Sequence, residues 1–164
     1  MAIAVLCALL AANACSPKPS NGPVCKAHDP GAIDLQSPVV SFKKDVVLGV
    51  FNGSCGFSSC HGSVTSSKGN LFLGQQGISA SDASTVRQKI VAVASEELAS
   101  MPFVTPGDPS KSFLMRKMDA DQCLFDPQCV DHSCLESMPQ GDSPLETAKR
   151  DTVRRWIAQG AQDN

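Results

Sequence analysis

Cysteine constrains this chain more than any other residue type, because eight of its 164 residues are cysteine. Cys55 and Cys60 are separated by four residues, and His61 follows the second cysteine directly. Two thiols and an imidazole in this order suit a local disulfide, part of a zinc site, or the covalent attachment of haem. A disulfide does not need the histidine, and a zinc site needs further ligands. Haem attachment uses all three residues, because the two thiols bond to the porphyrin and the imidazole then lies beside the iron.

The first residues predict a targeting segment. Residues 2–12 form an unbroken run of small and apolar side chains that is too short to cross a bilayer. Ala12-Asn13-Ala14 has the small-x-small pattern of a cleavage site, and Cys15 follows it. We therefore expect a signal segment at 1–14 and an exported protein of the periplasm or cell envelope. Cys15 stands where a bacterial lipoprotein carries its lipid, and simple cleavage without a lipid is the alternative.

The number of cysteines agrees with this interpretation. Cys7 leaves with the signal segment, and Cys15, Cys55 and Cys60 are assigned to lipid and haem. Four cysteines then remain, which is the even number that an oxidising compartment favours. They can form two disulfides in three possible pairings. These four are Cys25, Cys123, Cys129 and Cys134.

Apolar periodicity predicts an all-α domain at 41–162 that follows a flexible tether at 15–40. The tether is rich in Pro, Ser, Gly and Asn and shows no sustained period. Helices are expected from Ser41 to about 51, from Asp82 to Leu98, from Asp108 to Met118, and from a capping box at Ser143 to a stop at Gly160. No alternating pattern predicts a strand, and residues 119–140 form a loop with three cysteines.

A methionine is the expected second ligand of the iron, because a thioether opposite an imidazole suits electron transfer. Met115 and Met118 fall in a predicted helix and are expected to fill the core. Met101 and Met138 both precede proline in loops. We favour Met138, because it leads into the final helix and is better fixed. Met101, a histidine or no protein ligand are the alternatives.

The other polar residues are expected to be solvent-exposed. His28 is placed in the tether, and His132 is placed in the cysteine-containing loop, with a second haem ligand as its alternative. Three arginines of the last helix are expected on a solvated face, with a haem propionate as the alternative partner. These are Arg150, Arg154 and Arg155. Lys43, Lys44 and Lys117 are expected to be surface charges.

Four stretches together resemble a cytochrome c-like family of bacterial envelope proteins, many of them predicted lipoproteins. They are FNGSCGFSSCHG at 51–62, PGDPSKSFL at 106–114, Ser137-Met138-Pro139, and WIAQGA at 156–161. The resemblance covers residues 41–162. It implies a cytochrome c-like helical fold around one covalently attached haem c, held by Cys55, Cys60 and His61, with Met138 as the distal ligand. The four-residue spacer and the cysteines at 123, 129 and 134 depart from the ordinary pattern of that family.

Together these features predict a mono-haem electron carrier that exchanges electrons with redox partner proteins. With 14 basic and 16 acidic residues, the chain has no charge excess that indicates nucleic acid, and the membrane is reached only through a lipid on Cys15. The main alternative is a disulfide-stapled envelope lipoprotein without haem that binds or scaffolds. A haem enzyme of peroxidase type is a third possibility, but it needs an open sixth position, which a Met138 ligand would occupy.

Overall fold

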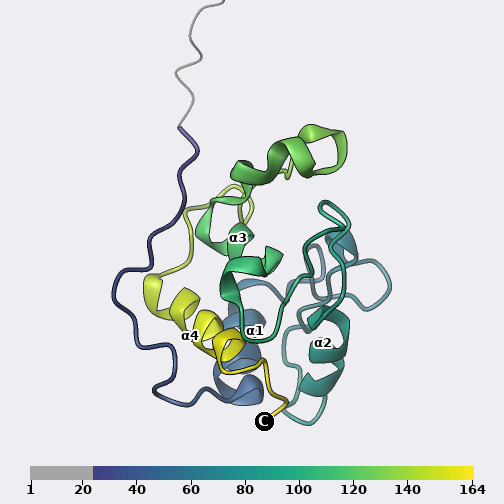
Figure 1. The fold of residues 1–164 in the computed structure, drawn as a ribbon. Helices are drawn as coiled ribbons and strands as arrows, with labels where there is room; N and C mark the ends of the chain where they lie inside the picture. Colours follow the sequence, from purple (N-terminus) through teal and green to yellow (C-terminus); the bar gives the residue numbers. More distant parts are fainter. Residues whose placement is uncertain (1–23) are drawn as a thin grey trace, which may run out of the picture.

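The computed structural model describes residues 24–164, so the predicted signal segment, Cys7 and Cys15 lie outside the described residues. Within this range the chain is helical, and the only strand-like pairings are isolated bridges between Val91 and Val104 and between Ala94 and Pro102. The absence of a sheet in this range is compatible with the predicted all-α class (Figure 1). The helical elements are η1 (Phe42–Phe51), α1 (Asn52–Ser54), η2 (Lys68–Asn70), α2 (Ala83–Ile90), η3 (Pro109–Lys111), α3 (Phe113–Asp119), η4 (Gln122–Gln128), η5 (Val130–His132) and α4 (Thr147–Ala158).

The core is centred on η1 and α4, which pack against each other (Figure 1). η1 is wound as a π-helix and continues directly into α1. Phe42 stacks on Trp156 with ring centroids 4.6 Å apart, and both side chains are almost completely buried. The predicted apolar face of η1 is confirmed, because Val46, Val47 and Val50 are buried as well.

The last helix ends where the sequence predicts, but its first helical residue, Thr147, comes three residues after the predicted one, Pro144. Gly160 has φ +94°, its N–H donates to Ile157 O, and Ala161 N–H donates to Trp156 O. This is the pattern of hydrogen bonds that closes a helix at a glycine. The predicted capping box at Ser143 is wrong, since α4 begins at Thr147 and its N-cap residue makes no side-chain cap bond. The preceding Leu145 carbonyl accepts instead from Nε of Arg150, at 3.0 Å.

The second predicted helix is shorter than expected. α2 ends at Ile90 rather than Leu98, because Ala92 has φ +57° and turns the chain back. Ala92 N–H donates to Val104 O at 2.9 Å, and Phe103 N–H donates to Val93 O at 2.8 Å. The segment after α2 therefore forms its hydrogen bonds with residues 101–104, and the apparent helical register of Leu98 is a coincidence of spacing.

The third predicted helix has the expected start and an unexpected break. Asp108 accepts from the N–H groups of Ser110 and Lys111, as an N-cap residue does. The helix is then interrupted at Ser112, whose backbone is extended. Its hydroxyl accepts from Thr105 N–H and donates to Asp108 O, so this side chain replaces the helical bonds lost at the break. Two short elements, η3 and α3, result.

Residues 24–40 have no regular helix or strand but are fastened to the domain. They run along α4 in Figure 1. Cys25 is disulfide-bonded to Cys123, and His28 N–H donates to Asp121 at 3.1 Å. Gln159 of the helix end accepts from Val40 N–H and donates to the carbonyl of Pro38. The expected tether is thus attached at both ends of its described part.

The four cysteines assigned to disulfides are paired as Cys25–Cys123 and Cys129–Cys134. The sequence left three pairings open, and the fold selects this one. Two disulfides indicate an oxidising, non-cytosolic compartment. Among residues 24–164, no helix has both the length and the apolar character needed to cross a membrane.

Candidate functional site

The site is an apolar cleft of two adjoining hollows, with volumes of about 280 and 460 Å³. Cys55, His61 and Met138 line both hollows. Together the hollows fall in the range of roughly 300–1,000 Å³ that is usual for cofactor and ligand pockets. The wall of the first hollow is mostly hydrophobic: Leu71, Leu73, Phe103, Phe113, Leu114, Met118, Leu135 and Leu145. Three of the four predicted site residues thus share both parts of one cleft, and Cys60 lines the second.

The segment after α1 folds back on itself and brings both thiols to the cleft. The N–H groups of Cys55 and Gly56 both donate to Phe51 O at 2.8 Å, which ends the helix. Cys60 N–H then donates to Phe57 O at 2.9 Å, and His61 N–H donates to Cys55 O at 3.2 Å. These bonds place the two cysteines and the histidine on one tight loop. Both thiols are unbridged in the structure.

Two glycines let this loop close, and sequence analysis did not identify their role. A Cβ on Gly62 would lie 2.3 Å from the carbonyl oxygen of Gly56, and one on Gly56 would lie 2.3 Å from that of Gly74. Any side chain at either position would therefore displace backbone. The small residues of the spacer were the available signal, but only the folded chain shows which of them must lack a side chain.

His61 is buried and held in one orientation. The residue is 8 % exposed, and its Nδ1 lies 3.0 Å from Leu71 O. Because a carbonyl only accepts, Nδ1 must carry the proton, and Nε2 of the neutral ring keeps its lone pair. Burial lowers the pKa of His61 below its usual 6.5, and the backbone contacts with Leu71 and Lys68 only partly oppose this. A neutral ring with a free lone pair at Nε2 is able to bind a metal, and the same N–H to carbonyl contact orients metal-binding histidines in general.

Cys55 is a weak nucleophile in the folded chain. Burial, and secondarily the neighbouring Cys60 thiol, raises the pKa of Cys55 from 9.0 to about 12. The thiol therefore stays protonated at neutral pH. Such a thiol is chemically quiet unless a reaction partner is brought directly to it.

Of the two methionines weighed as ligands, only Met138 lies at the cleft. It lines both hollows, whereas Met101 lines neither and packs against the core. Met115 and Met118 are buried in α3, as expected. Met118 also reaches the wall of the first hollow, a position that the sequence interpretation did not foresee.

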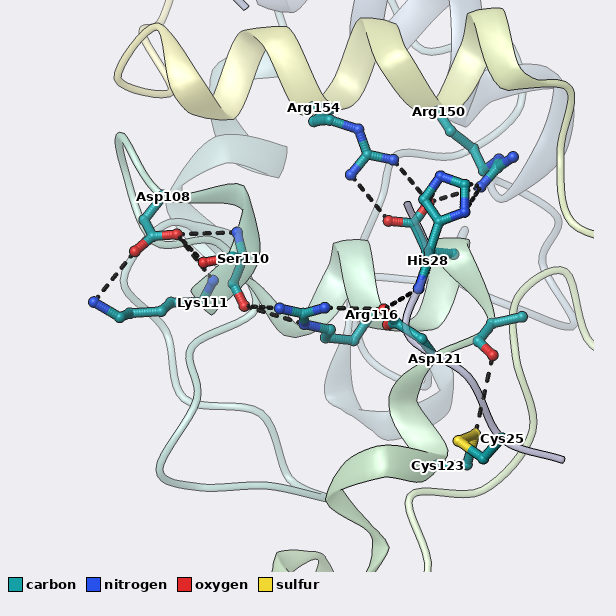
Figure 2. Close-up of polar contacts among 12 residues, drawn as sticks. Cys25, His28, Asp108, Ser110, Lys111, Arg116, Asp121, Cys123, Arg150 and Arg154 are labelled. Carbon is teal, nitrogen blue, oxygen red and sulfur yellow. Dashed lines mark hydrogen bonds and ion pairs between the residues drawn. A yellow bond between two sulfur atoms is a disulfide. The ribbon is translucent and has the colours of Figure 1, made fainter. Parts of the chain in front are cut away.

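The arginines expected on a solvated face of α4 are engaged with other groups. Arg150 and Arg154 both donate to the carboxylate of Asp119, at 2.8 Å each to Oδ1, and neither lines the cleft. Figure 2 shows the two side chains projecting from one side of α4, with His28 beside Arg150. Asp119 lies on another element, 31 or more residues earlier in the chain, so the helical pattern of α4 does not reveal the pairing. Arg155 donates to the carbonyl of Asp34.

Two further expectations for polar residues need correction, and one is confirmed. His28 is half-buried, with Nε2 3.2 Å from the guanidinium of Arg150, rather than solvated. Lys117 is 6 % exposed and lines the first hollow, so it is not a surface charge. His132 is exposed and away from the cleft, as expected.

Comparison with known proteins identifies no relative: no protein-family model, no curated protein and no solved structure matches this chain. Among residues 24–164, no group of three or more His, Cys, Asp or Glu side chains is placed to hold a metal ion by itself.

Proposed function

We propose that this chain is a mono-haem c-type cytochrome that carries electrons in the bacterial cell envelope. The observation that carries the proposal is the donor set of a single cleft. A buried, oriented imidazole at His61 lies on the same loop as two unbridged thiols, and the Met138 thioether lines the same cleft. In this proposal Cys55 and Cys60 would hold haem c through thioether bonds, and His61 and Met138 would bind its iron.

When bound, haem supplies an iron that alternates between the ferric and ferrous states. The chain's own residues set how readily it does so. The hydrogen bond from Nδ1 of His61 to Leu71 O makes the imidazole a better donor, and the thioether of Met138 favours the reduced state. The apolar wall formed by Leu73, Phe113 and its neighbours excludes water, which also disfavours extra charge on the iron.

Location and partners follow from the same proposal. The disulfides require an oxidising compartment, and haem c is attached outside the cytoplasm, so we place the protein in the periplasm or cell envelope. A lipid on Cys15 would anchor it there. Electrons would pass to and from other redox proteins through a small, transient interface, as is usual for such encounters.

The decisive experiment is a pyridine haemochrome spectrum of the full chain, produced in a bacterium that matures c-type cytochromes. We expect one haem c per chain, with peptide mapping that finds haem on the peptide containing Cys55 and Cys60. A colourless protein with these two cysteines joined to each other would refute the proposal. It would favour a disulfide-stapled envelope lipoprotein that acts as a binding or scaffold module.

The axial ligand is tested by a matched pair of variants. Both Met138 and Met101 precede a proline in a loop, but only Met138 lines the cleft. Met138→Ala should lower the reduction potential and remove the absorption band of methionine-ligated ferric haem, while Met101→Ala leaves both unchanged. The opposite pattern would identify Met101 as the ligand.

A further inference from the structure

Lys117 is a buried amine that the proposed function has not used. It lies on α3, is 6 % exposed, and lines the first hollow of the cleft. A lysine is rarely buried unless its amine is paired. Its Nζ lies 5.7 Å from the ring centre of Phe113, another residue of the cleft wall. Burying a charged amine costs free energy unless hydrogen bonds offset the loss of water.

The hydrogen bonds that this amine donates both go to one segment, the stretch that ends at Met138. Nζ of Lys117 donates to Cys134 O at 2.6 Å and to Glu136 O at 2.7 Å. The backbone carbonyl of Lys117 accepts from Met138 N–H at 2.9 Å. One residue therefore holds the segment at three points, and the last point is the backbone of the proposed ligand itself.

The segment has little regular structure of its own to keep it in place. Residues 133–146 contain no helix and no strand. The Cys129–Cys134 disulfide fixes its beginning, and α4 starts only at Thr147. Between these points, Gln122 donates to Leu135 O at 3.0 Å, and Arg150 of α4 donates to Leu145 O at 3.0 Å. Asp126 accepts from Cys134 N–H at 2.7 Å at the start of the segment. Within residues 134–138, Lys117 alone donates two hydrogen bonds from a charged group, and such bonds are stronger than neutral ones, so it is the main polar support of that part.

We infer that Lys117 is a positioning residue for the Met138 thioether: it ties the 134–138 segment to α3 and thereby holds the sixth ligand of the haem in the cleft. This inference rests on the proposed function. Lys117 does not itself need to touch the iron. Its role is to lower the freedom of the Met138 loop, so that the thioether competes well against other ligands for the sixth position.

The test uses competition by added imidazole in the haem-loaded full-length protein. Lys117→Met keeps the length and apolar stem of the side chain but removes both donated hydrogen bonds. We expect it to bind imidazole about tenfold or more tightly than the wild type, because two charge-assisted hydrogen bonds no longer favour the Met138 conformation. Its reduction potential should also fall. Lys111→Met, which removes the amine of a 76 % exposed side chain in η3, is the control and should leave the imidazole affinity unchanged.

The outcomes separate this inference from the proposed function. A wild-type protein without haem would refute the proposed function and this inference with it. A haem-loaded wild type whose imidazole affinity and potential are the same in Lys117→Met would refute only the role of Lys117. If Lys117→Met does not mature, Lys117→Gln replaces it. It keeps a shorter, neutral donor and should show a smaller rise in imidazole affinity, and an unchanged affinity in that variant would equally overturn the inference.

Discussion

Removing the Cys25–Cys123 disulfide should lower the free energy of unfolding about twice as much as removing Cys129–Cys134, because it closes a much longer loop. The first bond closes a loop with a sequence separation of 98 residues, and the second closes one of 5. A cross-link stabilises a protein mainly by restricting the unfolded chain, and the restriction grows with the logarithm of the loop length. This relation gives about 4.7 kcal/mol for the long loop and about 2 kcal/mol for the short one.

The assay is urea unfolding followed by far-ultraviolet circular dichroism, on Cys25→Ala/Cys123→Ala and Cys129→Ala/Cys134→Ala double variants in the same haem state. Alanine is preferred to serine because Cys129 and Cys134 are buried, and a hydroxyl there would lack a partner. None of the four cysteines lines the cleft, so neither change removes one of its residues. An equal loss, or a larger loss for the Cys129–Cys134 variant, would refute the chain-entropy reasoning and would mean that local packing dominates.

Three further predictions concern single residues. Asp119→Ala leaves the buried guanidinium groups of Arg150 and Arg154 without their carboxylate and should lower the free energy of unfolding by about 3–5 kcal/mol. Asp163→Ala breaks a half-exposed pair with Lys43 at 3.6 Å and should cost less than about 1 kcal/mol. Urea unfolding measures both, and similar losses would contradict the structural role given to Asp119. Gly62→Ala forces a Cβ against backbone and should cost about 1–3 kcal/mol, while Gly53→Ala, with open space in a helix, should be neutral or slightly stabilising by thermal unfolding. In protein without haem, alkylation of Cys55 should be slow at pH 8, because only the thiolate reacts and the pKa of this thiol is raised to about 12. The rate should rise about tenfold per pH unit above pH 8. A rate that levels off near pH 9 would contradict the burial of this thiol.

The parts of the fold that were predicted correctly are those specified by neighbouring residues. The cap at Asp108 and the stop at Gly160 depend on side chains and backbone angles within a few positions, and both are present. The apolar face of η1 is equally local. The errors arise where distant residues compete for the same backbone groups. The capping box at Ser143 does not form, although its sequence is suitable, because the chain before α4 makes other contacts, such as that of the Leu145 carbonyl with Arg150.

In the candidate site, too, the sequence predicts what depends on a residue's own chemistry and misses what depends on distant partners. The thiols, the imidazole and Met138 are visible in the sequence because their chemistry identifies them. The partners that support them are not visible, because a carbonyl acceptor has no sequence signature. Leu71 O, which orients His61, is one such acceptor. Lys117 looked like a surface charge for this reason, since the two carbonyls that bind its amine lie 17 and 19 residues further along the chain.

Three separate segments of the chain build the cleft. Its walls come from residues 53–73, from 97–118 and from 135–145. The third segment has no regular structure, so its position depends on contacts with the second, chiefly those of Lys117. The first segment positions its own ligand through the short contact of His61 with Leu71 O. We therefore expect the two sides of the cleft to differ in rigidity: His61 is fixed by its own loop, whereas the hold on Met138 depends on contacts between distant segments. In the proposed cytochrome, changes in the core should then weaken binding of the iron by Met138 before binding by His61.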